Sequence, residues 1–296
     1  MGDPACISVI IPAYNYAGSL PRAVLSVLEQ REPATEVVVV NDGSTDNTGQ
    51  VLAALQQQWP NLIVVTQDNA GAAAARNHGV RIATGRYLLM LDADDELLPG
   101  SLATFKAALE RQPDVALALG SYISVTADGK EKVRAASSLE PQSPERIIRS
   151  YLLDKDISIS HARALFRRDV LETCPYPENI QSGEDLAVFA YALVAGPSLR
   201  IDDVVARVYK HEGSLRQQRS SVDPKVIADA VFRCLPDSCQ SLKQSYYAQC
   251  LLSTFRAEAA QGDKQAARDY YVEALKLSPR QALRWTYVRK FLRVVV

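Results

Sequence analysis

The first hundred residues alternate short apolar runs of strand length with amphipathic runs of helix length. This alternation is typical of consecutive strand–helix units around a parallel sheet. Four consecutive valines at 37–40 indicate a strand that is covered on both faces. We therefore expect an α/β fold with flanking helices and a mostly parallel central sheet. The expected strands are 7–11, 36–40, 62–65 and 87–91; the expected helices are 19–30, one capped by Ser44 or Asp46, and an alanine-rich one ending at 83.

The regular pattern weakens after residue 111 and changes character near residue 220. From residue 224 the periodicity is helical and no strand pattern occurs. We therefore predict an α/β domain over residues 1–220 and an all-α C-terminal region over residues 221–296. Between these regions we expect helices at 99–111 and 185–195, strands at 115–125 and 158–166, and a pair of short strands over 199–209 around Asp202 and Asp203.

The C-terminal region carries two further patterns. Residues 262–279 resemble half of a tetratricopeptide helical pair, but one copy is too few for a stable array, so we expect an ordinary helical hairpin. The last residues interleave cations with aromatic side chains, which suits peripheral contact with an anionic membrane surface. A packed terminal helix with solvated charges is the alternative. The residues concerned are Arg284, Arg289, Lys290 and Arg293 with Trp285, Tyr287 and Phe291.

Composition narrows the class of protein. The 33 basic residues nearly balance 34 acidic ones, giving a net charge of -1, which argues against nucleic acid as a partner. No apolar run approaches the ~20 residues of a membrane span, and the N-terminus lacks a secretory leader. Five cysteines without metal-site spacing predict reduced thiols. We expect a cytoplasmic protein, with peripheral contact at the inner membrane face left open.

Polar side chains follow each of the four N-terminal strands at the point where it ends: Asn15, Asp42, Asn69 and Asp92. The carboxyl ends of parallel strands share one edge of a sheet, so these groups are expected to lie close together. Apolar residues beside Asp42 supply the walls of a base-and-ribose pocket, namely Pro12, Ala13 and Tyr14. The alternative role of Asp42 is that of an Asx-turn residue, because Asp-Gly-Ser favours turns.

Asp92-Ala93-Asp94 forms a DxD motif directly after an apolar strand. Alternate residues at a strand end present two carboxylates to one side, an arrangement that suits a hard divalent cation and a diphosphate. A cation would also relieve the repulsion between neighbouring acids. Helix capping is the other interpretation of such acids. The position of the motif at the same edge as Asp42 favours the metal site.

Four motifs in order resemble those of glycosyltransferase family 2, and the resemblance spans roughly residues 5 to 215. They lie at 8–15 (SVIIPAYN), 41–46 (NDGSTD), 69–71 with 75–77 (NAG, ARN) and 91–95 (LDADD), with further matches at 165–168, 183–185 and 209–211. The resemblance implies the GT-A fold, a Rossmann-like arrangement, and an inverting, metal-dependent transfer with Mn²⁺ or Mg²⁺. The segment 70–74 (AGAAA) lacks polar residues common in the family, so donor contacts there are left open.

Roles are carried over by position, as the resemblance implies them. Asp94 is the expected metal ligand, and His211 lies where some relatives place another, with a capping or surface histidine as the alternative. The acidic pair Glu184-Asp185 supplies the general base, for which we favour Asp185 and keep Glu184 as the fallback. Nucleotide-sugar-binding roles fall on Pro12, Ala13, Tyr14, Asn15, Asp42, Asn69, Gly71, Arg76, Asp92 and Ala93.

The resemblance predicts transfer of a sugar from a UDP- or dTDP-sugar to a hydroxyl of a glycan or lipid-linked acceptor, in bacterial lipopolysaccharide or capsule assembly. A catalytically silent nucleotide-sugar-binding scaffold on the same fold is one alternative, which the retained carboxylates disfavour. A sugar nucleotidyltransferase is another. It would carry a glycine-rich basic loop after the first strand, where residues 12–18 contain no cation. No residue in the sequence specifies the sugar, the linkage or the oligomeric state.

Overall fold

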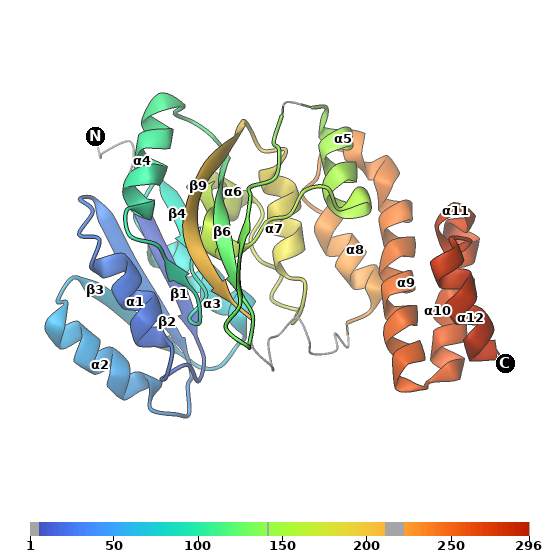
Figure 1. The fold of residues 1–296 in the computed structure, drawn as a ribbon, viewed down its shortest axis with the longest axis horizontal. Helices are drawn as coiled ribbons and strands as arrows, with labels where there is room; N and C mark the ends of the chain where they lie inside the picture. The colour runs from blue at the N-terminus through green and yellow to red at the C-terminus, as the bar shows by residue number, and fades with distance from the viewer. Residues whose placement is uncertain (1–5, 141, 211–221, 296) are drawn as a thin grey trace.

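The computed structural model describes residues 6–140, 142–210 and 222–295. Within them, a nine-stranded sheet has the order β3-β2-β1-β4-β8-β6-β9-β5, with β7 paired to β6 (Figure 1). The strands are β1 (Ile7–Ala13), β2 (Thr35–Asp42), β3 (Leu62–Gln67), β4 (Tyr87–Met90), β5 (Glu96–Leu97), β6 (Leu117–Val125), β7 (Glu131–Arg134), β8 (Ala164–Arg167) and β9 (Ser198–Tyr209).

Helices flank both faces of the sheet and continue into a C-terminal bundle (Figure 1). The first are α1 (Leu20–Leu28), α2 (Thr48–Gln58), α3 (Ala72–Ile82), α4 (Ser101–Arg111) and α5 (Pro144–Arg149). A π-helical turn (Ser150–Asp154) and a 3₁₀ turn (His161–Arg163) precede α6 (Arg168–Thr173) and α7 (Asp185–Ala192). The C-terminal helices are α8 (Pro224–Phe232), α9 (Lys243–Gln261), α10 (Lys264–Leu277), α11 (Pro279–Ala282) and α12 (Trp285–Val295), with a 3₁₀ turn at Asp237–Leu242.

The N-terminal half of the sheet is parallel. β1 pairs in parallel with β2 and with β4, and β2 pairs in parallel with β3. This confirms the predicted succession of strand–helix units, and it brings the carboxyl ends of these strands to one edge. Beyond β4 the sheet is mixed, because β8 runs antiparallel to both β4 and β6 while β6 and β9 are parallel.

Alternate residues of the parallel strands pack into different cores, one on each face of the sheet. Val37 and Val39 belong to the core covered by α1, α2 and α4, whereas Val38 and Val40 belong to the core covered by α3, α6 and α7. Successive side chains of a strand point to opposite faces, so a strand covered on both sides must be apolar throughout. The four valines predicted this burial from the sequence.

Two predicted elements differ from the structure. The pair of short strands expected around Asp202 and Asp203 is one strand, β9, whose register against β6 shifts near Ser121. The irregularity accommodates the two aspartates, which stay exposed without ending the strand. The strand expected at 158–166 is confined to β8, and a 3₁₀ turn precedes it. The periodicity of a short apolar run does not distinguish a strand from a helical turn, nor one irregular strand from two short ones.

The helical C-terminal region packs in two parts. Side chains of α8 and the start of α9, among them Phe232 and Tyr246, belong to the same core as α3, α6 and α7. A separate core begins at Leu251 and joins α9 to α10, α11 and α12. The chain therefore becomes helical near residue 224 but continues to pack on the α/β domain as far as Tyr246, and the separate helical core begins only at Leu251. Among the described residues, no helix combines the length and apolar character needed to cross a membrane.

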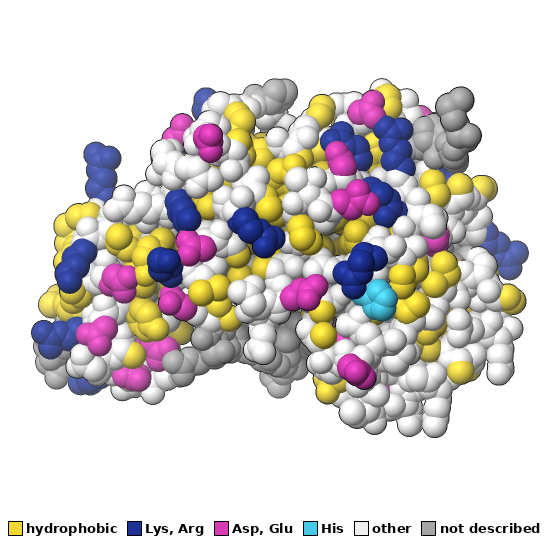
Figure 2. All heavy atoms as spheres, turned by 180° about the vertical axis from the view of Figure 1, so that it is seen from behind, with side chains coloured by type: hydrophobic (Ala, Val, Ile, Leu, Met, Phe, Trp, Pro, Cys, Tyr) yellow, Lys and Arg dark blue, Asp and Glu magenta, His cyan; other side chains and the backbone are white. Residues whose placement is uncertain are grey.

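Charged side chains of both signs are interspersed over the face of the molecule drawn in Figure 2. No large field of one sign dominates this view, in keeping with the near balance of charges in the sequence. All five cysteines lie among the described residues and are free thiols.

Candidate active site

A cavity of about 1050 Å³ opens at the carboxyl edge of the parallel strands. Loops after β1, β2, β3 and β4 form one side, and residues 151–161 and 182–186 form the other. All but one of the predicted site residues line it. They are Pro12, Ala13, Tyr14, Asn15, Asp42, Asn69, Gly71, Arg76, Asp92, Ala93, Asp94, Glu184 and Asp185. The remaining one, His211, lies outside the described residues.

Arg76 of α3 joins two of the predicted motifs. Its guanidinium donates from Nη2 to Asp92 Oδ1 at 2.9 Å and from Nη1 to Glu184 Oε1 at 2.8 Å. The residue is only 4% exposed, so these bonds form away from bulk water. Burial by itself would lower the pKa of Arg76, but Asp92, Tyr176 and Glu184 raise it above its usual value. Arg76 is thus a permanent cation that ties the DxD motif to the acidic pair.

Asp92 is held as a carboxylate. Burial alone would raise its pKa, yet the positive charge of Arg76 and a contact with His161 outweigh burial and lower the pKa well below its usual range. His161 Nδ1 lies 3.9 Å from Asp92 Oδ1, and its Nε2 lies 3.1 Å from the hydroxyl of Tyr176. The aromatic ring of Phe189 on α7 contacts the other side of this imidazole. Arg76 and His161 therefore hold the Asp92 carboxylate in place.

The two members of the acidic pair have different surroundings. Glu184 is 8% exposed and is committed to Arg76. Asp185 lines the cavity in the first turn of α7, and its side chain makes no hydrogen bond or ion pair with a described residue. A carboxylate without such partners has lone pairs that can accept a proton from a ligand. The Glu184 carboxylate is therefore occupied by Arg76, whereas the Asp185 carboxylate faces the cavity.

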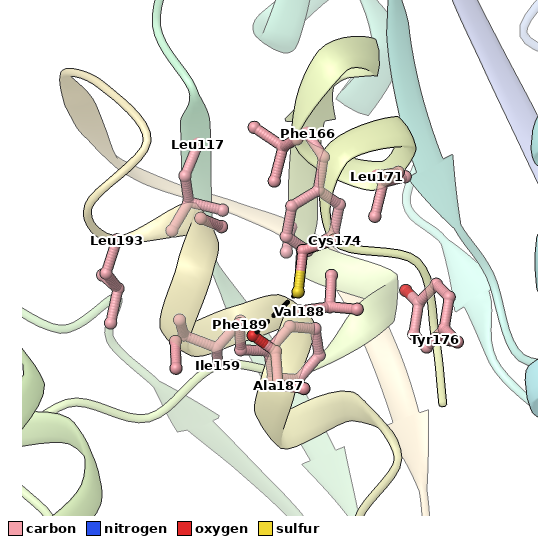
Figure 3. Close-up of a cluster of buried hydrophobic side chains, with 14 of the residues drawn as sticks. Leu117, Ile159, Phe166, Leu171, Cys174, Tyr176, Ala187, Val188, Phe189 and Leu193 are labelled. Atoms are coloured by element: carbon pink, nitrogen blue, oxygen red, sulfur yellow. Dashed lines mark hydrogen bonds between the residues drawn. The ribbon is translucent and has the colours of Figure 1, made fainter. Parts of the chain in front are cut away.

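The helix that begins with Asp185 is anchored by a buried cluster (Figure 3). Phe189 of α7 stacks on Phe166 of β8 with ring centroids 5.8 Å apart, and Cys174 donates to the carbonyl of Ala187 at 3.8 Å. Packed aromatic rings and a fully buried thiol leave little room for the helix to shift. The position of Asp185 is therefore set by the core beneath it.

Asp42 connects the ends of β2 and β3. Its side chain is buried and accepts three hydrogen bonds: from Gln67 Nε2 at 2.8 Å, from the Ala70 amide at 2.9 Å and from the Gly71 amide at 2.8 Å. Asp42 thus does not serve as an Asx-turn residue; it is the neighbouring Asn41 whose Oδ1 accepts from a local backbone amide, that of Ser44. Asp42 thus shapes the loop that lines the cavity.

Asn15 has a comparable role in the loop that follows β2. Its side-chain oxygen accepts from the amides of Thr45 and Asp46 at 2.8 and 3.2 Å, and its own backbone adopts a left-handed conformation with φ of 61°. Gly43 makes the turn possible, since its φ is 69° and an added Cβ would lie 2.7 Å from the amide nitrogen of Asn69. The glycine of the NDGS motif is therefore required by the backbone geometry of this turn.

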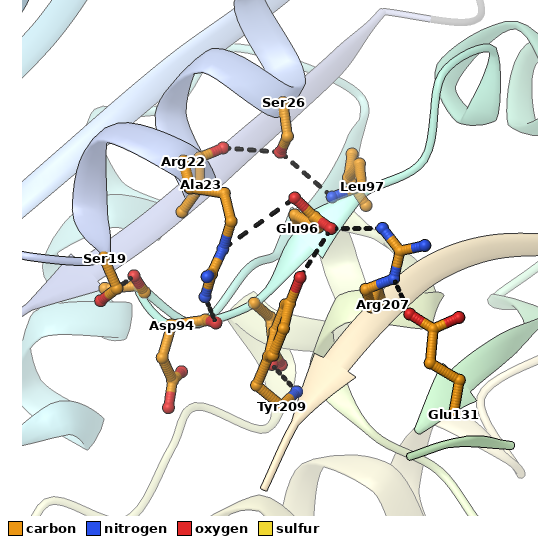
Figure 4. A network of polar contacts seen from close by, with 12 residues as sticks. Ser19, Arg22, Ala23, Ser26, Asp94, Glu96, Leu97, Glu131, Arg207 and Tyr209 are labelled. Carbon is orange, nitrogen blue, oxygen red and sulfur yellow. Dashed lines mark hydrogen bonds and ion pairs between the residues drawn. The ribbon is translucent and has the colours of Figure 1, made fainter. Parts of the chain in front are cut away.

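The DxD loop is held from behind by a polar network (Figure 4). Arg22 donates to the carbonyl oxygen of Asp94, and the Asp94 carboxylate points away from this contact. Glu96 accepts from Tyr209 Oη at 2.9 Å and from Arg207 Nη1 at 2.7 Å, and Arg22 stacks over the ring of Tyr209 at 3.9 Å. The side chain of the adjacent Asp95 accepts from the Tyr209 amide. This network joins the DxD loop to the end of β9.

The electrostatics of the cavity suit a cation. Burial, followed by the charges of Asp94, Asp92 and Asp95, raises the pKa of the Tyr16 hydroxyl to about 12. A hard divalent cation bound by oxygen atoms would neutralise this negative potential, and Asp94 presents a carboxylate where it could bind. Among the described residues, no three His, Cys, Asp or Glu side chains converge on one metal position. A cation here would therefore need ligand or solvent oxygens besides Asp94.

Several residues of the site were missed by the sequence reasoning. Tyr16, Lys155 and His161 line the cavity, and Tyr176 contacts both His161 and Arg76. Asn77 exchanges two hydrogen bonds with the backbone of Tyr176, at 2.9 and 3.0 Å, and so fixes the segment before the acidic pair. The available signals were the rarity of histidine, which occurs three times, and the asparagine that follows Arg76.

Comparison with known families identifies the class of this fold. Residues 8–174 match the family described as glycosyl transferase family 2. The chain belongs to this family. The succinoglycan biosynthesis protein ExoO of Rhizobium meliloti is 30% identical over 239 residues, covering 76% of this chain and 67% of ExoO. Three other curated relatives match over 97 to 119 residues, and the chain covers 32% or less of their length.

Solved structures show the same fold over nearly the whole chain of this family member. Residues 1–349 of Staphylococcus aureus TarS, solved with UDP-GlcNAc, superpose with a TM-score of 0.69 at 20% identity, covering 97% of this chain and 90% of that one. The mannosyltransferase PcManGT of Pyrobaculum calidifontis, solved with GDP-Man and Mn²⁺, gives a TM-score of 0.53 at 19% identity, covering 100% and 86%. The GT-A fold expected from the sequence is confirmed.

Proposed function

We propose that this chain is an inverting glycosyltransferase that moves a sugar from a UDP- or dTDP-sugar to an acceptor hydroxyl during assembly of a bacterial surface polysaccharide such as lipopolysaccharide or capsule. The observation that carries the proposal is the cavity in which Arg76 joins Asp92 of the DxD motif to Glu184, beside the half-buried carboxylate of Asp185. The relatives add support, since ExoO is a succinoglycan biosynthesis protein and TarS was solved with UDP-GlcNAc.

The donor is proposed to lie along the loops after β1, β2 and β3. Pro12, Ala13 and Tyr14 supply apolar walls for a nucleobase, with Tyr14 43% exposed to the solvent. Asp42 faces the same cavity with acceptor lone pairs beyond its loop contacts. The proposed donor site is completed by Asn15, Asn69, Gly71, Arg76, Asp92 and Ala93.

A divalent cation, Mn²⁺ or Mg²⁺, is proposed to be held by Asp94 together with the donor diphosphate. The complex of PcManGT with GDP-Man and Mn²⁺ and the negative potential at Tyr16 support this assignment. When bound, such a cation stabilises the charge that grows on the departing diphosphate. His211 stays a candidate second ligand by its place in the sequence.

Transfer is proposed to occur by one displacement at the anomeric carbon. The Asp185 carboxylate accepts the proton of the acceptor hydroxyl while the hydroxyl oxygen bonds to that carbon. The bond from the carbon to the diphosphate oxygen breaks at the same time, and its electron pair leaves with the nucleoside diphosphate. Attack from the face opposite the leaving group inverts the configuration. Glu184 cannot serve equally well, because Arg76 occupies its carboxylate.

The acceptor is proposed to be a glycan or a lipid-linked sugar that enters between the DxD loop and residues 151–161. Apolar side chains on that side, including Tyr151 and Ile157, offer a surface on which a sugar ring can pack. We further propose a catalytic unit at residues 1–220, a supporting helical unit at 221–296, and a cytoplasmic location at the inner face of the membrane.

Calorimetric titration with UDP and dTDP, and with GDP as the control nucleotide, tests the donor site. Wild type, Asp94→Ala and the exposed control Asp202→Ala are each titrated with and without Mn²⁺. The proposal expects metal-dependent binding of a pyrimidine nucleotide that is lost in Asp94→Ala and kept in Asp202→Ala. Transfer from a matching α-linked sugar nucleotide should then yield a β-linked product by NMR. Nucleotide binding without any transfer would favour the silent scaffold instead.

A further inference from the structure

The two faces of α12 have different surroundings. Tyr287, Phe291 and Val294 face the C-terminal bundle, and the ring of Phe291 stacks on Tyr271 with centroids 4.1 Å apart. These residues recur at helical spacing and form one apolar face of α12. The opposite face of the helix is exposed to the solvent.

The outward face of α12 carries large apolar side chains. Trp285 is 69% exposed and Leu292 is 52% exposed, and they lie on the side of the helix opposite Tyr287 and Val294. Leu283, just before the helix, is 61% exposed. These three are among only five large hydrophobic residues exposed in the described part of the chain. Their concentration within ten residues marks an interaction surface.

The charge of this segment has one sign. Residues 274–296 contain six of the 33 basic residues and none of the 34 acidic ones, whereas the whole chain carries a net charge of -1. Arg289 and Arg293 flank Trp285 and Leu292 on the exposed face, with Lys290 beside them. Within the part of the chain that the structure describes, none of these three cations lies within ion-pair distance of a carboxylate, and residues 274–296 supply no acid of their own. Their positive charge is therefore available to an external partner.

We infer that the outward face of α12, made of Trp285, Arg289, Leu292 and Arg293, binds the surface of an anionic lipid bilayer. Trp and Leu insert at the headgroup boundary while arginine side chains contact lipid phosphates, which is how basic amphipathic helices lie in a membrane interface. The helix lies at the end of the molecule remote from β1 to β3, in red in Figure 1. A bilayer can thus contact α12 while the sheet stays in solution. The inference rests on the proposed location and not on the proposed transfer.

Tryptophan fluorescence provides a direct test, because the chain has only two tryptophans, Trp59 and Trp285. In the Trp59→Phe variant, Trp285 reports alone. Its emission is recorded while phosphatidylcholine vesicles, with or without phosphatidylglycerol, are added in the absence of donor and acceptor. We expect a blue shift with the anionic vesicles that reverses at high salt, since exposed charges are screened. An unshifted emission with anionic vesicles overturns the inference.

Vesicle flotation of matched variants assigns the surface. Arg289→Gln with Arg293→Gln should weaken binding on the order of 30-fold, by the usual worth of two cations at an anionic surface. The control pair Lys132→Gln with Arg134→Gln, on the exposed strand β7, should bind like wild type. Trp285→Ala with Leu292→Ala should also weaken binding, whereas its exposed apolar control, Val133→Ala, should bind like wild type. Equal loss in the control variants contradicts the inference. So does sedimentation showing a self-associated form that the α12 variants alone abolish, which would assign the face to a second copy.

Discussion

The guanidinium of Arg76 donates to the carboxylate of Glu184 at 2.8 Å, although 108 residues separate the two along the chain. The same guanidinium also binds Asp92, so one side chain of α3 holds together the end of β4 and the start of α7. The bridge therefore fixes the distance between two sides of the cavity.

Replacement of Arg76 should destabilise the fold as well as the site. Arg76→Ala leaves the buried Glu184 carboxylate without its cation, and loss of one partner of a buried pair costs about 3 to 5 kcal/mol. Urea unfolding measures the change. Arg86→Ala is the control, because Arg86 pairs with Asp114 at the surface and its loss should cost less than about 1 kcal/mol. Equal costs for the two variants would show that the Arg76 bridge is not a buried interaction.

Neutralising the two acids of the pair should have separable effects. Asp185→Asn should lower kcat by about 10²- to 10⁴-fold and leave nucleotide binding unchanged, because it removes the proton acceptor. Glu184→Gln should lower the free energy of unfolding more than Asp185→Asn does, because it weakens the bond to Arg76. Steady-state kinetics and urea unfolding of both variants check this. A reversed pattern would transfer the role of general base to Glu184.

The network behind the DxD loop should position the donor. Glu96→Gln weakens charge-assisted bonds to Arg207 and Tyr209, so we expect a loss of about 1.5 to 3 kcal/mol in stability. Because Arg22 holds the Asp94 carbonyl in the same network, the KM for the donor should rise more than kcat falls. Asp202→Asn, at an exposed ion pair near the start of β9, serves as the control. An unchanged donor KM in Glu96→Gln would limit the network to a structural role.

Acid should remove part of the stability through Asp92. Its pKa is lowered in the folded chain by Arg76 and His161, so the unfolded chain binds the proton more readily. The stabilisation is present above the unfolded pKa of about 4 and is lost as the pH falls below it toward the folded pKa. Urea unfolding between about pH 6 and about pH 3 should therefore be less pH-dependent in Asp92→Asn than in wild type. Parallel curves would contradict the role given to Asp92.

The N-terminal half of the fold and the identity of the donor-side motifs could be predicted from the sequence. Strand-length apolar runs, helical periodicity and the Asp-Gly-Ser turn are local patterns, and β1 to β4 formed where those patterns lie. The edge shared by Asp42 and Asp92 followed from the parallel order alone. Less regular segments were harder, as β9 illustrates, because an irregular register lets one strand continue through two aspartates.

The sequence by itself determined the class of fold, the place of the cavity and most of the residues that line it, because the ends of parallel strands meet wherever such strands form. Only the tertiary structure decided which side chains meet within the cavity: Arg76 with Glu184, Asp42 with the loop at Ala70, and His161 with Asp92. It also decided that α8 shares the core of the α/β domain while α12 turns Trp285 outward. Such contacts depend on side-chain direction and packing between elements far apart in the chain, which spacing within one element does not encode.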